Sequence, residues 1–171
     1  AYDVGGYALH VIRAGKGSVL DVTAERPILD ADLAEDGSVC YTVKGQLSWG
    51  HCFRIWDASG AEVGMIKQVV LTWLPRFDIY VGGRCVGTIR KELTLFKPKF
   101  TLDMNGWTID GDWFEWDYSI RSASGEIVAV ISKELLHWSD VYAIDAPNPS
   151  DALPALLVAL AIDAEKCSRG D

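Results

Sequence analysis

The sequence predicts a mostly β protein, a closed antiparallel barrel of about twelve strands around a buried C-terminal helix. Two observations predict this fold class. The first is a series of turn-forming glycines between apolar, β-prone runs, with gaps of 23, 23, 23 and 19 residues, at Gly37, Gly60, Gly83, Gly106 and Gly125. Such a period indicates one supersecondary unit copied several times. The second is the C-terminal segment Leu153–Ile162, which is apolar on every side and must therefore be buried on every side.

The N-terminal residues 1–27 are less regular than the rest of the chain. The repeat is clear over residues 28–166, whereas two short strands are expected before it, at Tyr7–Ile12 and Val19–Val22. A chain of 171 residues is long enough for one hydrophobic core. We therefore expect residues 1–171 to form a single domain that begins with these less regular strands.

Each unit of the repeat is expected to be a β-hairpin. In the first clear unit, Phe53–Trp56 and Val63–Lys67 flank the turn Ala58-Ser59-Gly60, where glycine supplies the positive φ that a tight hairpin turn requires. The strands expected in later units are Phe77–Val81, Val86–Arg90, Phe100–Met104, Trp107–Ile109, Tyr118–Arg121 and Val128–Lys133. Longer links join the hairpins and carry an aromatic residue and, at Pro75 and Pro98, a proline that ends the ladder.

A turn-rich segment precedes the C-terminal helix, and either Asn148 or Ser150 is expected to cap it. Pro154 must lie in the first turn, because a proline deeper in the helix would break the hydrogen-bond ladder. The apolar segment is shorter than the roughly 20 residues that a membrane-spanning helix needs, so no transmembrane segment is expected. A closed barrel filled by this helix would bury the helix and leave no sheet edge.

Charge and cysteine content limit the classes of function. The formal net charge of -8 argues against a nucleic-acid partner, because such a groove draws its affinity from clustered Lys and Arg. The cysteines have no metal-binding spacing and are expected to be free thiols in a reducing, intracellular compartment, at Cys40, Cys52, Cys85 and Cys167. The compartment is expected to be cytoplasmic or organellar, since a start at Ala1 without Met fits removal of an upstream targeting segment.

Several short stretches occur in an order typical of one protein family. They are Ile66-Lys67-Gln68, Leu74–Tyr80, Ile89-Arg90-Lys91, Leu95–Phe100, Gly111-Asp112-Trp113, Ile131-Ser132-Lys133, Trp138–Tyr142 and Asp151–Asp163. Through them the sequence resembles the LURP-one-related family of the tubby C-terminal-like superfamily, which includes the phospholipid scramblases. The resemblance covers residues 28–166 and implies a twelve-stranded barrel around a C-terminal helix. Pro154 and residues 1–27 depart from the family pattern.

The family has no settled enzymatic activity that the resemblance could transfer to this chain, and no cofactor is expected. Relatives suggest two roles, binding of phosphoinositide headgroups and lipid movement, although fold alone does not fix function. Basic residues at similar positions of two adjacent units form a candidate anionic-ligand patch: Lys67, Arg76, Arg90, Lys91, Lys97 and Lys99. They would hold a phosphorylated headgroup through charge-assisted hydrogen bonds. The alternative is that these residues make up an ordinary solvated outer face.

Tryptophans in the links are candidate interface residues. These are Trp49, Trp73, Trp113, Trp116 and Trp138, all expected at one end of the strands. Exposed tryptophans there would contact a partner, because Trp is enriched in binding hot spots. The alternative is that they plug the end of the barrel or pack on neighbouring links.

The sequence offers weak signals for metal binding and catalysis. Asp110-Gly111-Asp112 supplies oxygen ligands without a complete calcium loop, and His137 with Ser139 and Asp140 contains triad residue types in one link, where triad geometry is not attainable. We therefore expect no catalytic residue and no metal or cofactor site. The expected function is a non-enzymatic binding or scaffold module with a protein partner, such as a subunit of a larger assembly. The alternative is a peripheral membrane module that binds anionic phospholipid headgroups.

Overall fold

A computed structural model gives the fold of the chain. It describes residues 7–13, 19–25, 39–46, 48–93, 99–112, 117–133 and 142–169. For residues 7–13, 19–25 and 39–40, among a few others, it describes the backbone alone.

Twelve strands and one long helix make up the described chain. The strands are β1 (Tyr7–Arg13), β2 (Val19–Glu25), β3 (Val39–Gly45), β4 (Cys52–Asp57), β5 (Glu62–Gln68), β6 (Arg76–Val81), β7 (Arg84–Glu92), β8 (Lys99–Leu102), β9 (Trp107–Asp112), β10 (Asp117–Arg121), β11 (Ile127–Lys133) and β12 (Tyr142–Ala146). A short 3₁₀ turn, Pro149–Asp151, leads into α1 (Ala152–Arg169).

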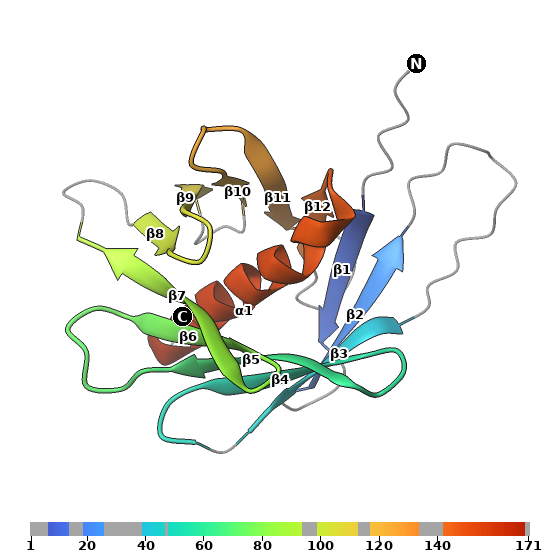
Figure 1. The fold of residues 1–171 in the computed structure, drawn as a ribbon, viewed down its shortest axis with the longest axis horizontal. Helices are drawn as coiled ribbons and strands as arrows, with labels where there is room; N and C mark the ends of the chain where they lie inside the picture. The colour runs from blue at the N-terminus through green and yellow to red at the C-terminus, as the bar shows by residue number, and fades with distance from the viewer. Residues whose placement is uncertain are drawn as a thin grey trace, which may run out of the picture.

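Every strand pairs antiparallel with its neighbours in the sequence. The ladder runs from β2 through β11 to β12, and β12 pairs with β1, so the strand order closes on itself as a barrel. Figure 1 shows the strands arranged around α1, which passes through the middle of the molecule. The connections between antiparallel strands therefore alternate between two ends of the barrel.

Alternation along each strand sends one set of side chains inward. In β6, Phe77 and Ile79 are buried, whereas Arg76, Asp78 and Tyr80 on the other face are half-exposed. The inward side chains of the other described strands join the same core, including Val43, Ile55, Ile66, Ile89, Phe100, Leu102, Trp107, Ile109, Tyr118, Ile120, Ile131 and Ile144.

The helix α1 fills the barrel. Every residue from Ala155 to Ile162 is at most 2% exposed, as a helix that is apolar all round requires. Asn148 caps the 3₁₀ turn that leads into α1: its side-chain oxygen accepts a hydrogen bond from the Ser150 amide at 3.1 Å, and its carbonyl accepts one from the Asp151 amide at 3.0 Å. Pro154 lies in the first turn, as predicted.

A buried ion pair links the wall of the barrel to the helix. Lys91 Nζ of β7 lies 3.1 Å from Glu165 Oε1 of α1, and the two side chains are only 10% and 4% exposed. Two charges this deeply buried are stable together, because each compensates the other's lost hydration.

The mostly β class, the antiparallel order and the C-terminal helix are confirmed. The hairpin turns at Gly60, Gly83, Gly106 and Gly125 are confirmed by positive φ angles of 83°, 75°, 69° and 89°. Gly37 lies outside the described residues. One strand is shorter than expected: β8 ends at Leu102, and Asp103 begins a turn in which its carboxylate, in place of a backbone carbonyl, accepts a hydrogen bond from the Thr88 amide at 2.6 Å.

Candidate binding surface

The two ends of the barrel carry different connections. At one end, the turn end, short turns join β4 to β5, β6 to β7, β8 to β9 and β10 to β11. At the other end, the loop end, longer segments join β3 to β4, β5 to β6 and β7 to β8. We define the loop pair as residues 48–51, between β3 and β4, and residues 69–75, between β5 and β6.

Large apolar side chains project into solvent at the loop end. Trp49 is 88% exposed, Leu71 102%, Trp73 103% and Val70 40%, and all four belong to the loop pair. Leu93, directly after β7, is 86% exposed at the same end. Single exposed apolar residues are ordinary, but a group of them marks an interaction site.

Hydrogen bonds hold the first loop against the end of β5, next to the second loop. The His51 amide donates to the Gln68 side-chain oxygen at 3.0 Å, and the Gln68 amide donates to the His51 carbonyl at 2.7 Å. Gly50 sits so close to the second loop that a Cβ there would lie 2.8 Å from Cγ1 of Val70. The loop pair is therefore one structural unit.

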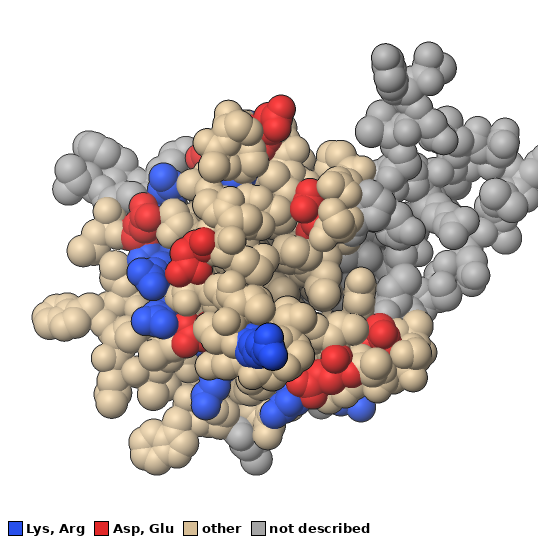
Figure 2. Space-filling model, viewed as in Figure 1, with Lys and Arg blue, Asp and Glu red and all other residues tan. Residues whose placement is uncertain are grey.

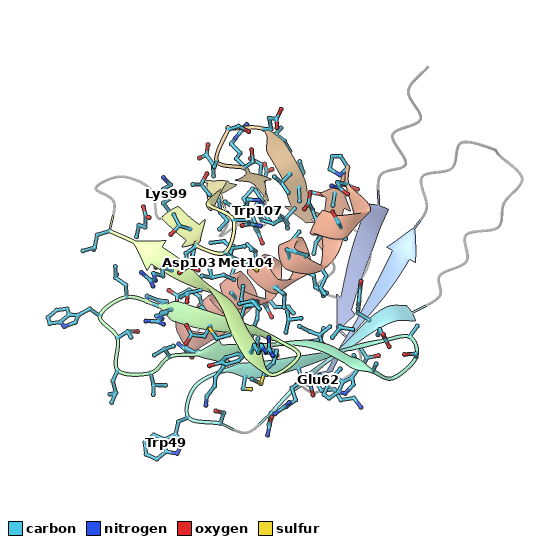
Figure 3. The ribbon with its side chains drawn as sticks, in the orientation of Figure 1. Trp49, Glu62, Lys99, Asp103, Met104 and Trp107 are labelled. Carbon is cyan, nitrogen blue, oxygen red and sulfur yellow. The ribbon has the colours of Figure 1, made fainter. Side chains whose placement is uncertain are left out.

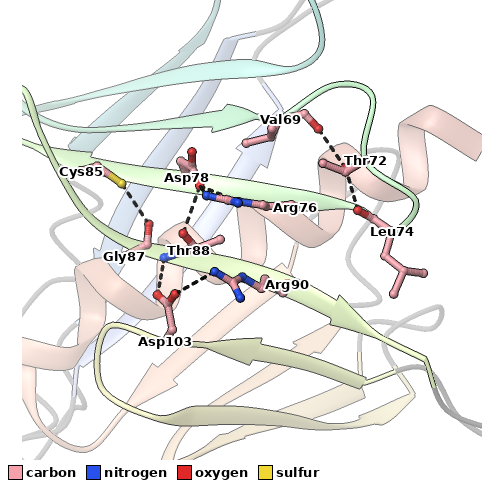
Figure 4. Close-up of polar contacts among 10 residues, drawn as sticks. All are labelled: Val69, Thr72, Leu74, Arg76, Asp78, Cys85, Gly87, Thr88, Arg90 and Asp103. Atoms are coloured by element: carbon pink, nitrogen blue, oxygen red, sulfur yellow. Dashed lines mark hydrogen bonds and ion pairs between the residues drawn. The ribbon is translucent and has the colours of Figure 1, made fainter.

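The β5–β6 loop is also fixed internally. Thr72 Oγ1 donates to the carbonyls of Val69, at 3.2 Å, and Leu74, at 2.8 Å (Figure 4). At the base of the loop, the Val69 amide donates to the Arg76 carbonyl at 2.9 Å. Leu71 has a φ of 64°, a left-handed conformation that bulky residues rarely adopt. Such strain persists only where the surrounding structure enforces it.

Three of the predicted basic residues lie together on the outer face beside the loop pair. Arg76 and Arg90 are directly paired between β6 and β7, and Lys67 at the end of β5 pairs with Asp78. Arg76 contacts the Asp78 carboxylate at 3.0 Å, and Arg90 contacts Asp103 at 3.5 Å (Figure 4). Figure 2 accordingly shows Lys and Arg interspersed with Asp and Glu on the visible face.

The other predicted basic residues are placed differently. Lys91 is separated from the outer set, because its side chain is buried and its ammonium group contacts Glu165. This position follows from strand geometry, since Arg90 and Lys91 are consecutive in β7 and point to opposite faces. Lys99, the first residue of β8, is half-buried. Lys97 lies outside the described residues.

Two of the five predicted interface tryptophans are described. Trp49 and Trp73 are exposed, so for these two the plug or packing alternative is wrong. Figure 3 shows Trp49 pointing away from the barrel, whereas Trp107, a strand residue, lies in the core at 6% exposure. Trp113, Trp116 and Trp138 lie outside the described residues.

A cysteine and a tyrosine among the described residues have a raised pKa. Burial raises the pKa of the Cys52 thiol above 9.0, so this thiol is protonated at neutral pH. Desolvation, with the Asp78 charge as a smaller cause, raises the pKa of Tyr80. Cys52 and Cys85 carry free thiols, as predicted. Cys40 and Cys167 are outside the residues whose side chains are described.

In the described part of the chain, two further features are absent. There, the His, Cys, Asp and Glu side chains form no group of three that could hold a metal ion. The helix in that part lacks the length and hydrophobicity to cross a bilayer.

Sequence reasoning missed Val70, Leu71 and Leu93 as exposed residues. The signal available was the apolar run Val69-Val70-Leu71 inside a link, where a polar turn is normally expected. It also missed that segments 67–68 and 48–51 lie side by side, which depends on pairing of β4 with β5.

The fold defines a class of protein, an antiparallel β barrel that encloses its C-terminal helix. Within this class the chain belongs to the LURP-one-related family, whose model matches residues 28–163. It is 32% identical over 130 residues to the uncharacterized protein YxjI of Bacillus subtilis (strain 168), covering 75% of this chain and 79% of that protein. Its fold is similar to the crystal structure of an Arabidopsis thaliana protein, with a TM-score of 0.64 at 18% identity, covering 94% of this chain and 92% of that one.

Proposed function

We propose that the chain is a non-enzymatic binding module and that the loop pair is its binding surface. The observation that carries the proposal is the exposure of Trp49, Leu71 and Trp73 on two loops that approach each other closely at Gly50 and Val70. Exposing large apolar side chains to water is unfavourable, and a partner that buries them gains the corresponding free energy.

The rigidity of the loop pair supports the same role. A surface already fixed in its binding conformation loses little conformational entropy on association. Thr72 fixes the β5–β6 loop through two backbone carbonyls, and the His51–Gln68 hydrogen bonds fix the β3–β4 loop beside it. Trp is the residue type most enriched in binding hot spots. The expected partner is a protein in a larger assembly.

A comparison of native complexes tests this proposal. The full chain, a loop variant (Trp49→Ser, Leu71→Ser and Trp73→Ser) and a control variant (Val81→Ser and Ile127→Ser) are compared in native extracts by size-exclusion chromatography. The control removes apolar side chains that are 43% and 49% exposed away from the loop pair. We expect the full chain and the control to elute in a complex, or to sediment with membranes, and the loop variant to be released. If all three behave alike, the loop pair is not the binding surface.

A second candidate function is recognition of anionic phospholipid headgroups by a tubby C-terminal-like barrel. The observation in its favour is charge segregation: residues 67–99 contain seven Lys and Arg against two Asp and Glu, in a chain of net charge -8. Charge reversal at Lys97 and Lys99 tests it, with sedimentation of phosphoinositide vesicles as the measurement. Unchanged sedimentation, or no binding by the parent chain, would reject the basic patch.

A further inference from the structure

At the loop end, exposed apolar side chains and basic residues lie next to each other, at the base of the β5–β6 loop. Lys67 is the last residue but one of β5 and Arg76 is the first residue of β6, so a basic residue stands on either side of the exposed tip formed by Val70, Leu71 and Trp73. Arg90 lies across from Arg76 in the neighbouring strand. The Lys91 amide donates to the Pro75 carbonyl at 3.0 Å, which ties the end of β7, and with it exposed Leu93, to the same loop base.

We propose that the loop pair inserts into the interface of an anionic lipid bilayer while Lys67, Arg76 and Arg90 face the headgroups. This inference rests on the proposed binding role of the loop pair, and it names a lipid surface in place of a protein as the partner. Indole rings have an apolar body and one polar N–H, and they favour the boundary between acyl chains and headgroups. Lys and Arg beside an apolar tip add attraction to anionic lipids.

The form of the surface favours a bilayer over a pocket in a protein partner. Trp49, Leu71 and Trp73 are almost completely exposed on separate tips, so they contact little of the parent structure. A protein would need a complementary cavity for each tip, whereas a fluid interface accepts any projecting apolar group. The left-handed Leu71 and the Thr72 hydrogen bonds hold the second tip in its projecting form before it meets the membrane.

Vesicle flotation tests the inference with the purified full chain. One set of vesicles contains phosphatidylcholine alone, and the other contains equal parts of phosphatidylcholine and phosphatidylserine. We expect salt-sensitive binding to the anionic set, a loss of about tenfold or more in the loop variant, and no change in the Val81→Ser and Ile127→Ser control. Circular dichroism of each variant establishes that the fold is intact, as expected for exposed positions.

A matched pair of charge variants tests the role of the basic residues. Lys67→Gln removes a charge at the loop end, and Arg84→Gln removes one at the turn end of the same basic segment. Loss of a basic residue near an anionic surface weakens binding by about fivefold, so we expect that decrease for Lys67→Gln and none for Arg84→Gln. Quenching of Trp fluorescence by brominated lipids should occur for the parent chain and decrease in the loop variant.

The other outcomes separate this inference from the proposals on which it rests. Anionic vesicle binding that survives in the loop variant would overturn insertion and leave headgroup recognition. Absence of vesicle binding, together with a protein complex that the loop variant loses, would overturn the membrane inference and leave the loop pair as a protein-binding surface. If the loop variant changes neither vesicle binding nor the native complex, both proposals are wrong.

Discussion

The turn end and the loop end of the barrel join the same strands through connections of opposite character. At the turn end, the Asp57 carboxylate accepts hydrogen bonds from the Ser59 amide at 2.9 Å, the Ser59 hydroxyl at 2.6 Å and the Ala61 amide at 3.0 Å. At the loop end, the corresponding connection after β5 exposes Leu71 and Trp73 to water. In the first connection, polar groups form hydrogen bonds within the same turn. In the second, large apolar side chains remain exposed to solvent.

The requirements of folding explain the turn end of this barrel but not the loop end. Turns built from Asp, Ser and Gly suit a hairpin by their own chemistry. A left-handed Leu71 beside an exposed Trp73 contradicts both turn chemistry and the usual burial of large apolar side chains. Deviations of this kind are expected at functional sites, where local preference is sacrificed for another purpose.

The largest effect on stability is expected from removal of the buried ion pair, which lies inside the barrel near the loop end. Lys91→Met leaves the Glu165 carboxylate buried without its ammonium partner, which should destabilise the fold by about 3–5 kcal/mol. The double variant Lys91→Met with Glu165→Met replaces both charges by apolar groups and should recover most of that loss. Urea unfolding of both variants measures the difference. A double variant as unstable as the single one would show that the cost arises from packing.

Two glycine variants compare the ends directly. Gly50 and Gly60 both have positive φ angles, 91° and 83°, but a Cβ at Gly60 meets nothing within 4 Å, whereas one at Gly50 meets Val70 at 2.8 Å. Gly60→Ala should therefore cost about 1–2 kcal/mol from the backbone alone. Gly50→Ala should cost about 2–4 kcal/mol, because crowding between the loops is added. Equal losses in chemical denaturation would show that the two loops separate without cost.

Removal of the strained leucine should raise stability while it lowers binding. Leu71→Asn replaces a residue that disfavours a φ of 64° by one that tolerates it, and it removes no packed side chain. We expect a gain of about 0.5–1 kcal/mol in the free energy of unfolding, together with weaker vesicle or partner binding. Thermal unfolding and the flotation assay measure the two effects. A loss of stability would mean that Leu71 packs against the protein in solution.

The smallest effect is expected from the Asp57 turn. Its carboxylate has a pKa below the ordinary 3.8, first because the Ser59 side chain donates to it and also because backbone amides do. A lowered pKa in the folded state means that the unfolded chain binds the proton more readily. The stabilisation is therefore present above the ordinary pKa and is lost as pH falls through the lowered one. Asp57→Asn should remove this acid-dependent part of the urea midpoint, and an unchanged pH profile would contradict the assignment.

The sequence allowed prediction of the parts of the fold that depend on local chemistry. Gly60 and Gly125 mark turns, and the apolar residues before Asp163 require a buried helix, so both features could be recognised without coordinates. The inward direction of the Lys91 side chain could also be predicted, because Lys91 directly follows the outward-pointing Arg90 in the strand. Its pairing with Glu165 could not be predicted, because that contact joins residues far apart in the sequence.

Exposure of the link tryptophans could not be predicted in the same way. A tryptophan in a link has the same neighbours in the sequence whether it packs on the next link or projects into solvent. The structure decides this for Trp49 and Trp73, through the hydrogen bonds between His51 and Gln68 and through Thr72. The candidate surface therefore depends on tertiary contacts between two loops, whereas the turns depend on residues adjacent in sequence.

The position of α1 has a consequence for synthesis of the protein. The strands emerge from the ribosome first, and their inward apolar faces have nothing to pack on until Ala152–Arg169 has been made. The pairing of β1 with β12 also joins the two ends of the strand series. Contacts between such distant residues slow folding and prolong the exposure of apolar surface. A nascent chain halted before Ala152 should therefore aggregate or need a chaperone, whatever its strands can form by themselves.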